Sequence, residues 1–266
     1  MSNLELQEKL IEWGLLDPPA DGLFGGQSQA ALNYARQLCG LGESIETGLI
    51  LSQTDPIPLR LDNSLASRIV RYMMAKDYHV SKGENLFNIV YLEGADEDGS
   101  PNSDAPNLWN DLRIVIEIKK DGTPKIIDCW SATTEPGRKY TVSPMNSGGA
   151  FRIEFGQYKS WQVGTHKDHE ALVQVSDLCG FRDGNKDYAR SGDKQVEGLF
   201  GVNQHWGYDM QTVEGASAGC LVGKTKTGHR EFMSIIKRDR RFQANSGYTF
   251  LTTIIAGDDL AKKFPA

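Results

Sequence analysis

Cysteine and long apolar runs are scarce in this sequence of 266 residues, and each shortage excludes a class of protein. The four cysteines, Cys39, Cys129, Cys179 and Cys220, lie far apart and form no CxxC pair. That spacing argues against a disulfide scaffold and against a cysteine-rich zinc site. No apolar run approaches the roughly 18 residues of a membrane span, so we expect no membrane insertion.

Positive charge is also in short supply. The chain has 29 lysine and arginine residues against 35 aspartate and glutamate residues, a formal net charge of −6. A protein that coats nucleic acid needs a basic surface, so we predict no nucleic-acid partner. The N-terminus has no basic start followed by an apolar core, so we predict no signal peptide and a chain that is cytoplasmic until released.

The pattern of apolar residues changes near residue 80. Before it, helical spacing predicts helices over 4–16, 29–38 and 64–76, with Ser28 as an N-cap. After it, apolar runs bounded by turn residues predict strands at 88–92, 112–118, 125–130, 150–155, 171–175, 198–203 and 248–255, and a helix at 229–238. The sequence therefore predicts an α+β fold with a small helical domain at 1–80 and a β-rich domain at 81–266.

Cys220 and His205 are the residues best suited to catalysis. A cysteine nucleophile needs a base or a cationic partner that favours the thiolate, and imidazole is the usual choice. The small residues from Gly215 to Gly219 would keep Cys220 accessible and leave backbone N–H groups for an oxyanion. Ser217 could donate a further hydrogen bond, to that oxyanion or within the loop.

The opposing interpretation makes Cys220 a small buried apolar residue, because free cysteine is among the most buried residue types. The Gly-Ala-Ser-Ala-Gly stretch before it and the His-x-Gly element upstream favour catalysis instead. The other three cysteines lack such surroundings, and we interpret them as structural.

These residues carry a resemblance to a known family. The His-x-Gly element at 205–207, followed by Ser-Ala-Gly-Cys at 217–220, resembles the L,D-transpeptidase (YkuD-type) pattern over about residues 110–255. The resemblance implies a β-rich catalytic domain in which a cysteine attacks a stem peptide of peptidoglycan and forms an acyl-enzyme. It implies that Cys220 is the nucleophile and His205 the base, with Ser217 and Gly219 in the cysteine loop.

Two positions depart from that family's pattern. Ala218 stands where the family has a histidine, and Gly223-Lys224 stand where an arginine is usual. The Ser-Ala-Gly-Cys variant is more similar to phage-encoded relatives than to crosslinking enzymes. This likeness implies a phage endolysin that hydrolyses the cell wall.

A second resemblance, independent of the first, covers about residues 4–40. Leu6-Gln7-x-x-Leu10, then Asp21-Gly22-Leu23-Phe24-Gly25, then Ser28-x-x-Ala31-Leu32 is similar to the small helical peptidoglycan-binding domain. The glycines allow the turn, and we expect Phe24 to pack between the two helices rather than to contact a ligand. The resemblance implies bacterial peptidoglycan as the partner of this segment.

Substrate contacts are expected close to the proposed base and nucleophile. Trp206 adjoins His205, and Lys224 and Arg230 belong to a basic stretch that follows Cys220. Stem peptides carry carboxylates, and cations near a cysteine lower its pKa. A solvated helix face explains the basic stretch equally well.

Metal sites have weaker support. His166-x-x-His169 could place two zinc ligands together, but no third ligand is evident and the HExxH motif is absent. The segment from Asp183 to Asp187 resembles half of a calcium loop and has Lys194 where the loop needs glutamate. We predict exposed turns at both places, no metal and no cofactor.

Together these patterns predict a monomeric, peptidoglycan-degrading cysteine peptidase that cleaves stem peptides or crosslinks. Three alternatives stay open. The first is an L,D-transpeptidase that transfers the acyl group to an amine, and the second is a non-catalytic wall-binding or virion structural protein. The third is a zinc peptidase that uses His166 and His169.

Overall fold

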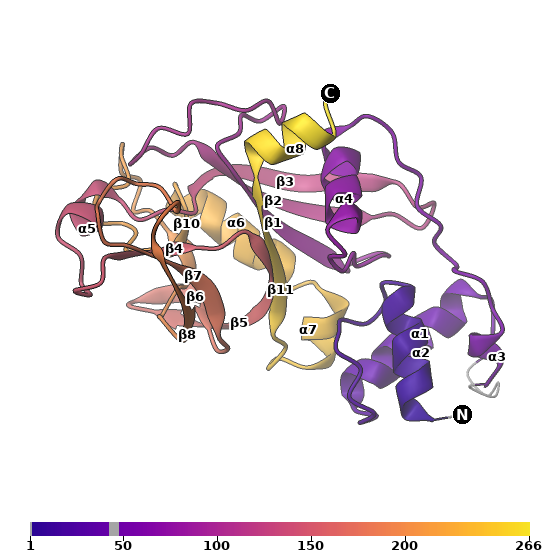
Figure 1. The fold of residues 1–266 in the computed structure, drawn as a ribbon. Coiled ribbons are helices and arrows are strands. Elements are labelled where there is room, and N and C mark those ends of the chain that lie inside the picture. The colour runs from indigo at the N-terminus through magenta and orange to yellow at the C-terminus, as the bar shows by residue number, and fades with distance from the viewer. Residues whose placement is uncertain (1, 43–47) are drawn as a thin grey trace. The chain divides into compact units, whose positions relative to one another are not determined.

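The computed structural model describes residues 2–42 and 48–266 of the chain (Figure 1). The chain divides into two compact units, each assembled from segments distant in the sequence. The first unit comprises Met1–Asn88, Ile116–Ile127 and Ile236–Ser246, and the second comprises Ile89–Val115, Asp128–Ile235 and Gly247–Ala266. None of the helices in the described ranges has the length and apolarity that crossing a bilayer requires.

The first unit holds most of the helices. They are α1 (Asn3–Glu12), α2 (Gly26–Leu38), α3 (Gly48–Leu51), α4 (Leu65–Ala75) and α7 (Arg240–Ala244). α1 begins with a capping box, in which Ser2 and Glu5 each accept a hydrogen bond from the other's backbone N–H. Phe24 packs against the apolar core that α1 and α2 share.

The start of α2 differs from the sequence expectation. The helix begins at Gly26 with Gly25 as N-cap, so the prediction that Ser28 caps it is wrong. Ser28 is instead buried, and its hydroxyl accepts a hydrogen bond from Nε2 of Gln7 at 3.1 Å. A hydroxyl with a partner on α1 is held inside the helix pair and is not available to cap α2.

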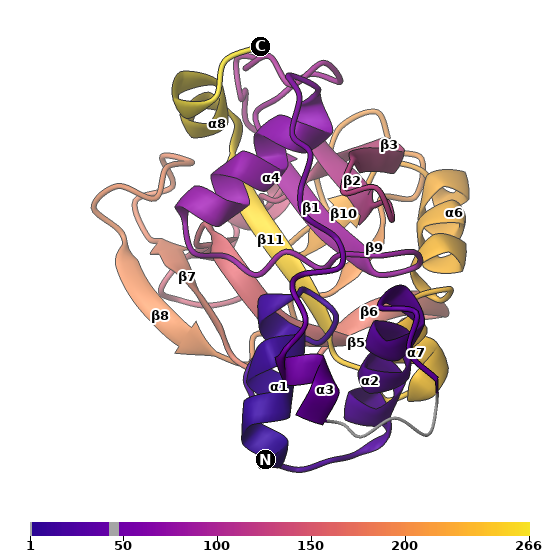
Figure 2. The same cartoon turned by 90° about the vertical axis from the view of Figure 1, so that its right-hand side faces the viewer.

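A closed β-barrel organises most of the remaining chain, in the strand order β1-β11-β5-β6-β9-β10-β3-β2 (Figure 2). Its strands are β1 (Phe87–Glu93), β2 (Asp111–Ile118), β3 (Pro124–Thr133), β5 (Gly156–His166), β6 (His169–Gln174), β9 (Gln204–Trp206), β10 (Leu221–Gly223) and β11 (Phe250–Ala256). A separate three-stranded sheet contains β4 (Ala150–Ile153), β7 (Leu178–Asp183) and β8 (Lys194–Gly198). The helices α5 (Arg138–Val142), α6 (Lys226–Ile236) and α8 (Gly257–Lys263) complete the fold.

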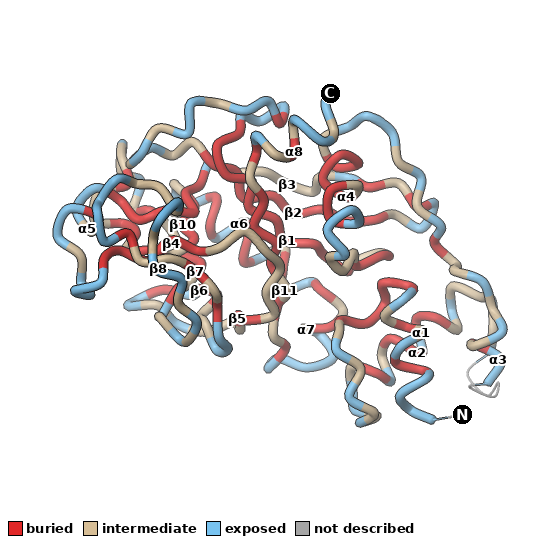
Figure 3. The backbone as a smooth tube through the Cα atoms, in the orientation of Figure 1, coloured by how far each residue is buried: buried red, intermediate tan, exposed pale blue. Residues whose placement is uncertain are grey.

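The barrel strands β1 and β2 are buried along their whole length (Figure 3). Their apolar centres, residues 89–92 and 114–116, are typical of strands that are covered on two faces, and the buried polar residues among them include Arg113 and Glu117. β1 pairs in parallel with β11, with Ile89 beside Thr252, although more than 160 residues separate them. The strand predicted at 198–203 is wrong, because β8 ends at Gly198 and β9 begins only at Gln204.

The predicted α+β arrangement, a helical domain followed by a β-rich domain, is also wrong. α7 lies late in the chain, yet it packs against α2, and its Arg241 forms a buried ion pair with Asp17. The strands β1, β2 and β3 each have residues in both units. Contacts between such distant segments leave no trace in local periodicity, and local periodicity was the basis of the predicted order. The boundary between residues 80 and 81 stays a prediction.

Candidate active site

Two neighbouring barrel strands bring Cys220 and His205 to the same place. β9 and β10 run parallel, with His205 beside Val222. Side chains alternate along a strand, so Cys220, two residues before Val222, falls on the same face as His205. Both residues line one pocket of about 400 Å³. The two residues predicted to be nucleophile and base therefore share a cavity.

The pocket combines apolar walls with positive charge. Its aromatic lining includes Phe151 from β4 and Phe200 from the segment before β9. Among the described residues, the charged ones that line it are Lys167 and Arg182, and none of them is a carboxylate. The guanidinium of Arg182 lies 5.5 and 5.0 Å from the ring centres of Phe151 and Phe200. The two rings therefore hold this cation in place beside the pocket.

The thiol of Cys220 is partly exposed and is held by backbone groups. Its Sγ accepts a hydrogen bond from the Asn203 N–H at 3.5 Å and lies 3.6 Å from the carbonyl oxygen of Gly201. Burial raises the pKa of this thiol, and the Asn203 N–H and the charge of Lys167 offset only part of the rise. In the described part of the chain, Sγ has no hydrogen bond to a histidine. The resting group is therefore a neutral thiol.

The ring of His205 is almost fully buried and is fixed by one hydrogen bond. Its Nδ1 lies 2.8 Å from the carbonyl oxygen of Trp206. Since a carbonyl only accepts, Nδ1 carries the proton and Nε2 keeps its lone pair. Burial first, and then the neighbouring His166, hold the pKa of His205 well below its usual value. His205 is thus a neutral imidazole whose Nε2 has a lone pair and no hydrogen-bond partner in the described part of the chain.

The loop before Cys220 is shaped by Ser217 and Gly219. The Ser217 hydroxyl donates to the Cys220 carbonyl at 2.9 Å and accepts the Gly219 N–H at 3.1 Å. Gly219 has a φ of +120°, and a Cβ there would lie 2.5 Å from the carbonyl oxygen of Phe151. Both residues are thus committed to the turn. Among the described residues, the N–H of Cys220 has no acceptor, which makes it a candidate donor to an oxyanion.

Three predicted substrate-binding residues do not line this pocket. The Trp206 ring stacks on His169, with ring centres 3.8 Å apart, and the guanidinium of Arg230 lies 5.3 Å from the Trp206 ring centre. Lys224 donates its backbone N–H to Ser131. The structure brings Trp206 and Arg230 to each other rather than to Cys220. Their role in binding stays a prediction.

Sequence reasoning missed Arg113, which anchors the strands that carry the site. It is fully buried, and its guanidinium donates to the carbonyls of His205 and Leu221 at 3.1 and 3.4 Å. These two bonds join β9 to β10. A Cβ at Gly223 would lie 2.7 Å from the guanidinium, so this position needs glycine. A single arginine inside an apolar strand carried no signal that it would support the site.

The sequence suggests His166 only as a zinc ligand, whereas the structure places it in the lining of the Cys220 pocket. It ends β5, pairs with His169 across the β5–β6 hairpin, and lines the Cys220 pocket. Its ring stacks on that of His205, with centres 4.4 Å apart and planes 15° apart. The exposed turn predicted over 166–169 is correct only for Lys167 and Asp168, since His166 and His169 lie in strands and His169 is buried.

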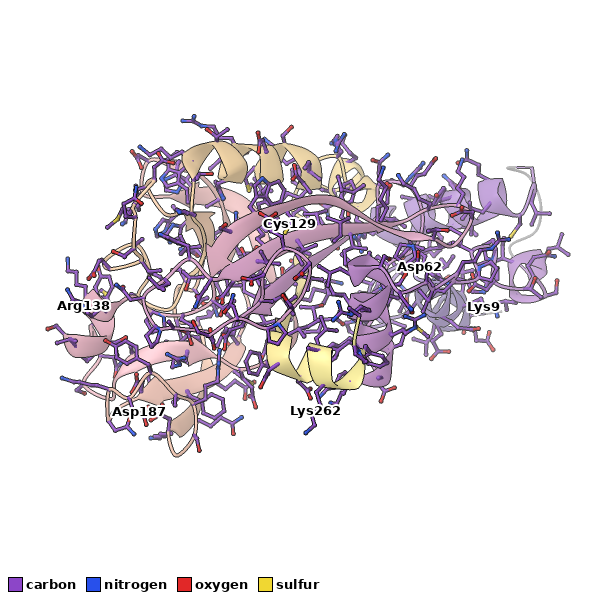
Figure 4. All side chains as sticks on the ribbon, turned by 90° about the horizontal axis from the view of Figure 1, so that it is seen from above. Lys9, Asp62, Cys129, Arg138, Asp187 and Lys262 are labelled. Carbon is purple, nitrogen blue, oxygen red and sulfur yellow. The ribbon has the colours of Figure 1, made fainter. Side chains whose placement is uncertain are left out.

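Within the described residues, two side-chain groups are compact enough to share a metal ion. One contains Glu93, Asp104 and Glu135, and the other contains Asp183, Asp187 and Asp193. Asp187 lies in the loop after β7 (Figure 4). Neither group includes a histidine, so the predicted zinc alternative at His166 and His169 gains no third ligand there.

Comparison with known proteins gives little similarity. No family model matches this chain, and no curated protein matches it. Among solved structures, a fused Zn-dependent amidase/peptidase/peptidoglycan-binding domain-containing protein from Clostridium acetobutylicum is 13% identical, over 95% of this chain and 94% of that one. Its TM-score is 0.31, which does not establish a shared fold. The geometry of the pocket therefore carries the functional assignment.

Proposed function

We propose that this chain is a cysteine-dependent peptidase that acts on the stem peptides or crosslinks of peptidoglycan. The observation that carries the proposal is one pocket lined by both the thiol of Cys220 and the neutral imidazole of His205. The choice of peptidoglycan rests on the two sequence resemblances, at 205–220 and at 4–40.

The resting state of the pair defines the order of proton transfer. Because the thiol and the imidazole are both neutral, His205 acts as a general base during attack rather than beside a preformed thiolate. Sγ bonds to the peptide carbonyl carbon as its proton passes to Nε2 of His205, and the carbonyl oxygen becomes an oxyanion near the Cys220 N–H. Collapse breaks the C–N bond, and His205 returns the proton to the leaving amine.

Water completes the cycle. His205 takes a proton from a water molecule, whose oxygen attacks the thioester carbon. The C–S bond then breaks, and the proton on His205 restores the Cys220 thiol. The acid product leaves with the oxygen of the water. An amine in place of that water would make the same chemistry a transpeptidation.

The charge of the pocket fits this substrate class. Lys167 and Arg182 line it without a facing carboxylate, and stem peptides carry carboxylates. Opposite charge raises the local concentration of a ligand in a partly enclosed cleft. A substrate whose carboxylate is replaced by an amide is expected to bind more weakly.

The decisive test is Cys220→Ala on purified peptidoglycan, followed by turbidity and by analysis of the released peptides. We expect the wild type to break stem peptides or crosslinks, and the variant to lose at least about 10³-fold of that rate, since the nucleophile is gone. Cys129→Ala is the matched control. Cys129 lies on β3 (Figure 4) and is not among the residues that line the pocket, and burial raises the pKa of its thiol to about 12.

Each alternative function predicts a different result. Undiminished turbidity loss in Cys220→Ala would eliminate the cysteine mechanism. New crosslinks among the products would assign transpeptidation instead of hydrolysis. Inactivation by a chelator, with Cys220→Ala still active, would favour the zinc peptidase. Absence of any chemical change, with binding to the wall retained, would leave a non-catalytic wall-binding protein.

A further inference from the structure

The Cys220 pocket contains a second imidazole, that of His166, which the mechanism above does not use. The ring lies parallel to that of His205 at a centre-to-centre distance of 4.4 Å, and both rings line the pocket. The two residues come from different strands, β5 and β9. Their chemical roles depend on which ring nitrogen of each one carries the proton.

Asn203 determines the proton position on His166. The Oδ1 atom of Asn203 accepts the Gln174 N–H at 3.0 Å, which fixes the orientation of the side-chain amide. Its Nδ2 therefore faces Nδ1 of His166, at 2.9 Å. An amide nitrogen only donates, so Nδ1 of His166 is the acceptor and the ring proton lies on Nε2.

The surroundings of His166 favour this neutral form. Burial lowers its pKa, and so do Lys167 and His169, while the exposed Asp168 opposes them. A proton on Nδ1 would also meet the N–H of Asn203. The neutral ring thus presents an N–H group, whereas the neutral ring of His205 presents a lone pair.

We propose that His166 is a further catalytic residue, whose Nε2–H donates a hydrogen bond to the reacting carbonyl oxygen of the substrate while Asn203 keeps that proton in place. The inference rests on the proposed function, because it assigns a role within the Cys220 reaction. It gives the pocket a side-chain donor for the oxyanion in addition to the Cys220 N–H. The two stacked imidazoles then have different roles, since His205 accepts a proton and His166 donates a hydrogen bond.

The first test removes the donor. His166→Phe keeps an aromatic ring without an N–H, and we expect it to lower kcat by about 10²-fold with little change in KM, the loss usual for one oxyanion donor. His166→Gln carries an amide N–H and should recover part of that rate. His169→Phe is the control, since His169 pairs with His166 across the hairpin but does not line the pocket.

The second test moves the proton. Asn203→Asp retains an acceptor for the Gln174 N–H but presents a carboxylate oxygen to Nδ1 of His166. The ring proton should then shift to Nδ1, which ¹⁵N chemical shifts of the imidazole report without any substrate. Activity at neutral pH should fall and recover at lower pH, where the imidazolium regains Nε2–H. Adding a carboxylate near the thiol would raise its pKa and move the pH profile in the opposite direction.

The outcomes separate this inference from the proposed function. If Cys220 is essential and His166→Phe keeps the wild-type kcat, the role of His166 is wrong and the cysteine mechanism stands. An unshifted proton in Asn203→Asp, or equal loss in His166→Gln and His166→Phe, also overturns the inference. If Cys220→Ala is fully active, both proposals fall together.

Discussion

Four of the five histidines of this chain lie in the second unit, and they form two contrasting pairs. His166 and His205 line the Cys220 pocket, and each has Nδ1 held by a neighbour and no hydrogen-bond partner for Nε2 among the described residues. The other two are buried away from that pocket: His229, on α6, has Nδ1 at 3.1 Å from Arg113 and Nε2 at 2.9 Å from the Glu170 carbonyl. His169 is buried against Trp206, and its Nε2 has no partner among the described residues.

Burial alone does not distinguish these pairs. It is the largest cause that lowers the pKa of His166, His205 and His229, and it brings the pKa of His229 to about 3. All three rings are therefore neutral at neutral pH. What differs is the group that meets the second ring nitrogen. A nitrogen that faces a cavity is accessible to a ligand, whereas both ring nitrogens of His229 meet buried groups of the protein and stabilise the fold.

The largest effect is expected from the pocket pair. His205→Gln removes the basic nitrogen, and we predict a loss of about 10²- to 10⁴-fold in kcat/KM on peptidoglycan fragments, the usual contribution of a general base. Its urea unfolding midpoint should change much less than its activity. Full activity in this variant would mean that His205 has no catalytic role. The proposed difference between catalytic histidines in the pocket and structural histidines elsewhere would then be wrong.

The interior pair is expected to affect stability instead. His229→Leu removes the ring that meets a buried guanidinium nitrogen of Arg113. A buried polar group left unsatisfied costs about 1–3 kcal/mol, so urea unfolding should show a loss of about that size. The Cys220-dependent rate per folded molecule should stay within a few-fold of the wild type. A variant that is stable but inactive would place His229 in catalysis.

The low pKa of His229 leads to a prediction of how the free energy of unfolding changes with pH. A histidine with a folded pKa of about 3 and an ordinary unfolded value near 6.5 binds its proton preferentially in the unfolded state. Its contribution is complete above pH 6.5 and is lost as pH falls toward 3, at up to about 1.4 kcal/mol per pH unit. When the free energy of unfolding, measured with urea at several pH values, is plotted against pH, its slope should be shallower for His229→Leu than for the wild type.

A smaller effect is expected at the cysteine loop. Ser217→Ala removes the hydroxyl that accepts from Gly219 and donates to the Cys220 carbonyl. We predict a loss of about 1–2 kcal/mol in unfolding free energy and a modest fall in kcat, because the loop loses its internal bonds but keeps its nucleophile. Ser217→Thr, which retains the hydroxyl, is the comparison. A fall in kcat as large as that of His205→Gln would assign Ser217 a direct catalytic role.

More of the candidate site than of the fold could be predicted from the sequence. Cys220, Ser217 and Gly219 stand within four residues, so local spacing identifies the cysteine loop, whereas the pairing of β9 with β10 brings His205 to it. Phe24 was likewise expected in the helical core, and it packs there. Strand β5 was missed, because its residues are mostly half-buried and do not alternate. The helical and β-rich segments were assigned to successive domains, and the structure corrects that order.

The amino-acid sequence by itself determined the helix pair near the N-terminus and the small-residue loop before Cys220, since helical spacing and small residues act over a few positions. Only the tertiary structure decided that His166 stacks on His205, that Asn203 orients it, and that Arg113 ties β9 to β10. These contacts join strands that lie tens of residues apart. They form only when the barrel closes, because strand pairing is set by hydrogen bonds and burial between segments that local sequence does not connect.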